Sequence, residues 1–230
     1  MKHTLTTLAL VGMVGVSGQA VAVSAPLASA TIDWSSFTVT LYSLNPEFTP
    51  TISFSDEYTY IHADNSSGLV YDYAYDWTTS LSAISGPAEA MADATALHAA
   101  TFGVGIASSF RQAGFTLSPM TLAVFSAYAS AEIAGGIDAS ANVSLGTSGP
   151  GASGSGWQHS YAYIHLSDWG GIYSDSGTLT TSFLNLTGGD MAGNLYANAY
   201  ASAPIPEPET YALMLAGLGL VGWMARRRRA

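Results

Sequence analysis

The central part of this 230-residue chain is expected to be all-β and to form an antiparallel β-sandwich, jelly-roll-like or immunoglobulin-like. Three observations predict this fold class. Short runs of residues alternate with a period of two and are rich in β-branched and aromatic side chains. Several runs carry alanine at every second position. Gly, Pro and Asn turns separate the runs, which is typical of sandwiches and barrels.

The first expected strands lie before residue 80. Residues 38–42 alternate and are rich in β-branched side chains. Strands at 51–54 and 58–62 follow a turn at Asn45-Pro46, and a further turn covers 64–68. Residues 69–77 then place aromatic side chains on one parity, which predicts a half-buried strand. These side chains are Tyr71, Tyr73, Tyr75 and Trp77.

Residues 88–101 are compatible with two structures. Alanine at 90, 92, 94 and 96 favours a strand, whereas Pro87 followed by Ala, Glu and Met is also a good helix opening. We favour the strand, because the period of two continues through His98 and Ala100. The remaining expected strands are 104–110, 114–117, 120–130, 161–166, 177–184 and 193–202. The Gly/Ser-rich segment 144–156 has no apolar period and is expected to be a loop or flexible insert.

Composition excludes several classes of function. The chain has no Cys, so a disulfide framework, a zinc-thiolate site and a Cys nucleophile are excluded. Charged residues make up only 10%, so Ser, Thr, Asn, Gly and Tyr must supply the polar surface. Between residues 31 and 203 there are 14 acidic residues and one cation, Arg111, hence 13 net negative charges. Such a body cannot neutralise phosphates, so we expect no nucleic-acid partner.

The N-terminus has the pattern of a secretory signal peptide. Lys2 and His3 precede an apolar run over 8–16 that is too short to span a bilayer. Small residues of the A-x-A type follow it, with Ala22 as the preferred cleavage position and Ala30 as the alternative. The expected signal peptide therefore covers 1–22, or 1–30, and the expected body covers 31–203.

The C-terminus has three parts in a fixed order. Residues 204–209 contain Pro206-Glu207-Pro208 and are stiff and extended, because proline fixes φ and cannot donate a hydrogen bond. Residues 211–225 are uncharged and apolar, and a helix of this length reaches about 22 Å, short of the ~30 Å hydrocarbon core. A basic cluster follows at once and should stay on the cytoplasmic side of the membrane. It consists of Arg226, Arg227, Arg228 and Arg229.

This arrangement resembles the PEP-CTERM sorting signal of Gram-negative bacteria, over residues 204–230. The resemblance implies transit through the inner membrane, recognition by an exosortase and cleavage near Pro206-Glu207-Pro208. It implies a cell-surface or extracellular location after processing, and an association with exopolysaccharide and biofilm systems. The competing interpretation is that helix 211–225 remains as a permanent single transmembrane anchor.

No catalytic constellation is evident, so we expect no enzyme, no cofactor and no metal. Gly154-Ser155-Gly156 lies in the flexible segment, where a strained nucleophile elbow could not be held. Asp72 and Asp76 would lie roughly 13 Å apart on one strand, too far for either glycosidase geometry. No Asp-x-Asp-x-Asp-Gly loop for calcium is present.

Carbohydrate contact is the better supported chemistry. Flat aromatic faces with polar rims, next to Asp and His, suit stacking against sugars, although such side chains also build sandwich cores. The preferred surface consists of Trp157, Tyr161, Tyr163, Trp169 and Tyr173. Three functions follow as hypotheses: a structural or interaction component associated with exopolysaccharide, a carbohydrate-binding module, and a secreted hydrolase.

Overall fold

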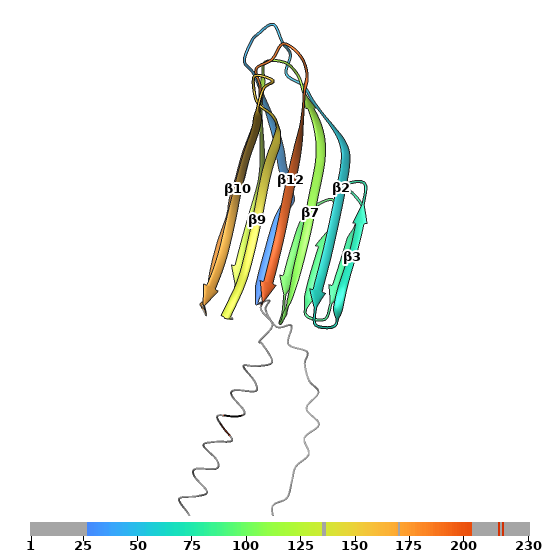
Figure 1. Cartoon of the computed structure of the whole chain (residues 1–230), viewed down its shortest axis with the longest axis vertical. Coiled ribbons are helices and arrows are strands. Elements are labelled where there is room, and N and C mark those ends of the chain that lie inside the picture. Colours follow the sequence, from blue (N-terminus) through green and yellow to red (C-terminus); the bar gives the residue numbers. More distant parts are fainter. Residues whose placement is uncertain (1–26, 135–136, 170, 204–215, 217, 219–230) are drawn as a thin grey trace, which may run out of the picture.

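The computed structural model describes residues 27–134, 137–169 and 171–203, together with Ala216 and Leu218, and its body is an all-β sandwich (Figure 1). Two six-stranded sheets pack around one hydrophobic core, and every strand pairing is antiparallel. Within these residues each sheet has six strands, so the sandwich holds more strands than an immunoglobulin domain or a jelly roll.

The strand order is as follows. The first sheet runs β11 (Tyr173–Asn185), β8 (Thr121–Ile133), β1 (Ala28–Ser43), β6 (Ala96–Thr101), β5 (Ala88–Ala92) and β4 (Leu81–Ser85). The second runs β10 (Trp157–Trp169), β9 (Ile137–Pro150), β12 (Met191–Ala203), β7 (Gly105–Leu117), β2 (Ile52–Asn65) and β3 (Gly68–Ala74). Strands of this second sheet carry the labels in Figure 1.

The alternating alanines lie inside the sandwich. In β8 and β12 alternate side chains are buried while their neighbours face outward, which confirms the period-two interpretation. Phenylalanine rings pack together in the same core, where the ring centroids of Phe125 and Phe183 lie 5.3 and 5.0 Å from that of Phe115. The core thus combines alternating alanines with large aliphatic side chains and a group of rings.

Residues 144–150 are a strand and not a loop. They form the second half of β9, in which Val143, Leu145 and Thr147 are buried. Gly146 and Gly149, which contributed to the expectation of an insert, are places where a neighbouring ring needs the space. A Cβ on Gly149 would lie 2.8 Å from Cε2 of Phe183, far too close. The expected insert is therefore wrong for 144–150, and the connection to β10 is reduced to 151–156.

Several expected elements merge or divide. Residues 104–110 and 114–117 belong to one strand, β7, and 51–54 and 58–62 belong to β2, which bulges at Asp56, where φ is +51°. Residues 88–101 are strand as favoured, but Asp93 divides them. Its carboxylate accepts hydrogen bonds from the backbone N–H groups of Thr95 and Ala96 and forms the turn between β5 and β6.

Strand β3 corrects the interpretation of the first aromatic run. Tyr71, Tyr73 and Tyr75 are exposed, and so is every residue of β3 except Ala74, so the strand is exposed on both faces and is not half-buried. The reason is that β3 is an edge strand paired only with β2. Trp77 lies beyond the strand and packs against the core.

Arg111 of β7 is fully buried. Its Nη2 donates to the backbone carbonyls of Trp77, at 2.9 Å, and of Asp93. The guanidinium carbon lies 5.0 Å from the centroid of the Trp34 ring. Burial lowers the pKa of Arg111 to about 10, so the side chain still carries its charge at neutral pH. Arg111 thus ties two turns to the core.

The ordered body begins before residue 31. Ala28 and Ala30 are buried in β1, between β6 and β8. Ala28 pairs with Thr101 and Ala203 pairs with Gly105, so the chain enters and leaves the body at one end, which we call the tail pole (Figure 1). The expected signal peptide 1–22 and Pro206-Glu207-Pro208 lie outside the described residues. So do Arg226–Arg229 and helix 211–225, except that Ala216 and Leu218 have helical backbone.

The described part of the chain contains no helix with the length and apolar character that a membrane crossing needs.

Candidate functional site

The outer face of the sheet β10-β9-β12-β7-β2-β3 carries exposed aromatic side chains at both of its edges. Because side chains alternate along a strand, residues paired in register across these strands project from the same face. One such row is Tyr163, Ser144, Asn198, Phe110, Tyr60 and Tyr73. We call this outer surface the aromatic face. At about 4.8 Å per strand, a row across six strands is roughly 24 Å wide.

Three of the five expected sugar-contact residues lie together on β10. Trp157, Tyr161 and Tyr163 share one parity and are 69%, 58% and 58% exposed. His159 lies between them. Its ring stacks on Tyr161 at 5.2 Å, and Tyr161 stacks on Tyr163 at 5.7 Å. The strand thus presents a line of nearly parallel rings to solvent.

The other two expected residues lie elsewhere. Trp169 ends β10, 12 positions after Trp157, which places its backbone roughly 40 Å away at the tail pole. Tyr173 begins β11, in the opposite sheet. The expected cluster of five residues is therefore wrong as a single surface, because the turn between β10 and β11 carries the chain from one sheet to the other.

Tyr196 completes the group on β10 and was not among the expected residues. Its ring stacks on His159 at 6.0 Å, and its hydroxyl and His159 Nε2 form a short hydrogen bond. Burial raises the pKa of the Tyr196 hydroxyl. Gly146 lies between Tyr161 and Tyr196 in register, and a Cβ there would lie 2.5 Å from Cε2 of Tyr196. The glycine therefore makes room for the ring.

A second aromatic group lies at the far edge of the same face. Tyr60 of β2 has its ring 5.6 Å from His62 and 6.3 Å from Tyr71. Tyr58 lies 6.4 Å from Tyr73. Burial lowers the pKa of His62, which stays neutral at neutral pH. The alternation at 69–77 indicated that these tyrosines share a side, but the sequence does not show that the side faces solvent.

A shallow hollow of about 300 Å³ lies at the end of the aromatic face opposite the tail pole. Its lining includes Trp157, Asn194, Asp56 and Gly114, so an exposed indole borders amide and carboxylate groups. Ser148 and Asn194 face outward in the same row as His159. The arrangement offers an apolar surface with hydrogen-bonding groups beside it.

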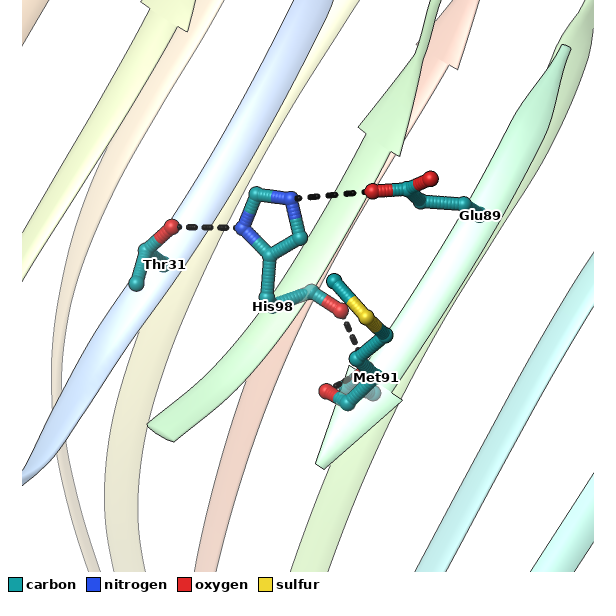
Figure 2. Close-up of polar contacts among 5 residues, drawn as sticks. Thr31, Glu89, Met91 and His98 are labelled. Atoms are coloured by element: carbon teal, nitrogen blue, oxygen red, sulfur yellow. Dashed lines mark hydrogen bonds and ion pairs between the residues drawn. The ribbon is translucent and has the colours of Figure 1, made fainter. Parts of the chain in front are cut away.

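The opposite sheet brings a threonine, a histidine and a glutamate from three neighbouring strands close together (Figure 2). Thr31 Oγ1 lies 2.9 Å from His98 Nδ1, and His98 Nε2 lies 3.9 Å from Glu89 Oε1. Burial lowers the pKa of His98, and Glu89 opposes this more weakly. Thr31 lies on β1, whose backbone pairs on both sides with β6 and β8, so its neighbouring N–H groups serve the sheet and are not directed at an oxyanion.

Asp76 also has a local structural role. Its Oδ1 accepts hydrogen bonds from the backbone N–H groups of Thr78 and Thr79, at 2.7 and 2.6 Å. Hydrogen bonds to the Thr79 hydroxyl and to these N–H groups lower the pKa of Asp76 to about 2. A carboxylate with that pKa cannot act as a general acid near neutral pH. Among the described residues, no three His, Asp or Glu side chains converge in a way that could hold a metal ion.

Comparison with known proteins identifies one segment. Residues 204–229 match the family model of the PEP-CTERM protein-sorting motif, which confirms the resemblance seen in the sequence. This motif implies export and processing by an exosortase, with a location at the cell surface or outside the cell. No curated protein and no solved structure matches the chain.

Proposed function

We propose that this chain is a non-enzymatic surface or extracellular matrix protein that binds extracellular polysaccharide through the aromatic face. The observation that carries the proposal is the line of exposed, stacked rings on β10. Aromatic rings offer flat apolar surface while their polar edges can bond to hydroxyl groups. An exposed apolar surface of this kind on a secreted domain marks an interaction site.

The shape of the face favours a polymer over a small sugar. The two aromatic groups occupy opposite edges of one sheet, and Ser144, Asn198 and Gln112 lie between them in register. A polysaccharide chain lying across the strands could contact rings at both edges and amide or hydroxyl groups between them. A single sugar ring would use only one group.

A structural component without a sugar site is the second candidate. The sorting motif supports it equally, because export alone does not require a ligand. Binding to polysaccharide distinguishes the two. Release of reducing ends on incubation with the polysaccharide would instead indicate the third candidate, a hydrolase.

The binding experiment uses the exported protein and the polysaccharides of the producing bacterium. We expect Tyr161→Ala combined with Tyr163→Ala to weaken binding at least about tenfold, since stacking contacts contribute roughly 1 kcal/mol each. Tyr128→Ala is the matched control, because Tyr128 is similarly exposed but faces outward from the opposite sheet. Unchanged binding in the double variant, or an equal loss in the control, would refute the assignment of the aromatic face.

Processing is tested by mass spectrometry of protein recovered from the surface or medium. We expect a C-terminus near residues 204–210, with removal of helix 211–225 and Arg226–Arg229 by the exosortase at the inner membrane. The arginines resist crossing the bilayer and hold the chain while the proline-rich segment is cut. A peptide ending at Ala230 in that fraction would show that the tail remains as an anchor.

A further inference from the structure

Strand β10 is a long edge strand. It has 13 residues and, among the described strands, pairs only with β9. Of the other three edge strands, β3 and β4 have seven and five residues, and β11 is equally long but carries the acidic residue Asp175. An edge strand presents unpaired backbone N–H and C=O groups that can template another strand. Proteins commonly prevent this with lysine, proline or a covering segment on the edge.

Only one end of this edge is covered. The Gln158 side chain reaches β11, where Oε1 accepts from the Leu184 N–H at 3.0 Å and Nε2 donates to the Leu184 carbonyl at 2.8 Å. The Thr181 hydroxyl donates to the carbonyl of Ser160 at 2.8 Å. Among the described residues, the backbone of 161–167 has hydrogen-bonding partners only in β9.

The open stretch also lacks the charge that protects the rest of the body. Residues 161–167 contain no Lys, Arg, Asp, Glu or Pro, in a body with 13 net negative charges between residues 31 and 203. No like charge on this stretch therefore opposes the approach of the same stretch of a second copy.

We propose that β10 pairs with β10 of a second copy of this chain, antiparallel and with Tyr163 on the two-fold axis. Tyr163 is the midpoint of Trp157–Trp169, and in this register residues 161–165 of one copy, all within the open stretch, lie opposite residues 165–161 of the other. The register places Tyr161 opposite His165 and Ala162 opposite Ile164, and no acidic residue opposite another. The two aromatic faces join into one continuous surface. This inference rests on the edge and does not require polysaccharide binding.

The antiparallel register determines when two copies can pair. Asp168 of β10 lies level with Ala139, and Ser140 next to it pairs with Ser202 near the end of β12, so β10 ends at the tail pole. Antiparallel pairing then points the tail poles of the two copies in opposite directions. Two copies held by their tails in one membrane face the same way and cannot pair, so pairing follows release of the tail.

The test measures the mass of the exported, processed protein by analytical ultracentrifugation across roughly micromolar to millimolar concentrations. We expect a monomer–dimer equilibrium that strengthens as added salt screens the negative charge. Tyr163→Lys and Tyr163→Glu should each weaken dimerisation at least about tenfold, because like charges directly opposite one another repel. An equimolar mixture of the two variants should restore the dimer.

The matched control is Tyr73→Lys, at an exposed tyrosine on the short edge strand β3. It should dimerise like the unmodified protein. A protein that stays monomeric throughout the range overturns the proposal. So does a dimer that survives Tyr163→Lys, a mixture that fails to restore pairing, or equal weakening by Tyr73→Lys. Circular dichroism of each variant verifies that the exposed substitutions leave the fold intact.

Discussion

Replacing Gly146 with alanine should disturb the aromatic face while leaving the sandwich folded. The added methyl would lie 2.5 Å from Cε2 of Tyr196, so the ring must swing outward toward solvent. Tyr196 then loses its hydrogen bond to His159, about 0.5–1 kcal/mol for a partly exposed bond, and its stacking, about 0.5–1.5 kcal/mol. Alanine in a strand regains about 0.5–1 kcal/mol over glycine.

The net loss of stability should therefore lie between about 0 and 2 kcal/mol, centred near about 1 kcal/mol, and a loss of about 1 kcal/mol lowers Tm by about 2–4 °C in a domain of this size. Gly193→Ala is the comparison. Gly193 faces the core, and its methyl would lie 2.7 Å from Cε2 of the buried Phe115, which has no solvent to move into. Overpacking there should cost about 1–3 kcal/mol. Urea unfolding followed by circular dichroism measures both changes.

Two further results would follow if this reasoning is right. Gly146→Ala should weaken polysaccharide binding although it removes no aromatic ring, and in a Tyr196→Ala background the same substitution should no longer destabilise the protein. If Gly146→Ala costs as much as Gly193→Ala, or still costs stability after Tyr196 is truncated, then the ring is not the reason for glycine at this position.

Two other predictions concern maturation and pH. N-terminal sequencing of the exported protein should find Val23 as the first residue. Cleavage after Ala30 instead would remove the buried Ala28 and Ala30 from β1, in the middle of a sheet. A mature N-terminus at Thr31 would contradict this prediction. Burial lowers the pKa values of His62 and His98 below their unfolded value of about 6.5, so the unfolded chain binds more protons. The contribution of these two neutral histidines to stability should be fully present above about pH 6.5 and should fall as the pH drops toward their folded pKa values. His98→Gln should flatten this pH dependence of thermal unfolding. An unchanged slope would show that His98 does not contribute.

The end segments and the strand periodicity could be read directly from the sequence. The sorting motif depends on the order of three adjacent segments, and all of them lie within 204–230. The alternating alanines of β8 and β12 are equally local, because the side-chain period of a strand is a property of its own backbone. These patterns also indicated which side chains share a face, such as Tyr71, Tyr73 and Tyr75.

Which strands become neighbours was decided only by the tertiary structure. Gly146 looks like part of a loop until Tyr196, 50 residues later, is placed across from it in register. Trp157 and Tyr173 look like one cluster until β10 and β11 are assigned to different sheets. Local alternation indicates which side chains lie on the same face of a strand, but solvent exposure and ring contacts depend on the partner strand. Those partners are set by pairing between distant segments, which no local pattern contains.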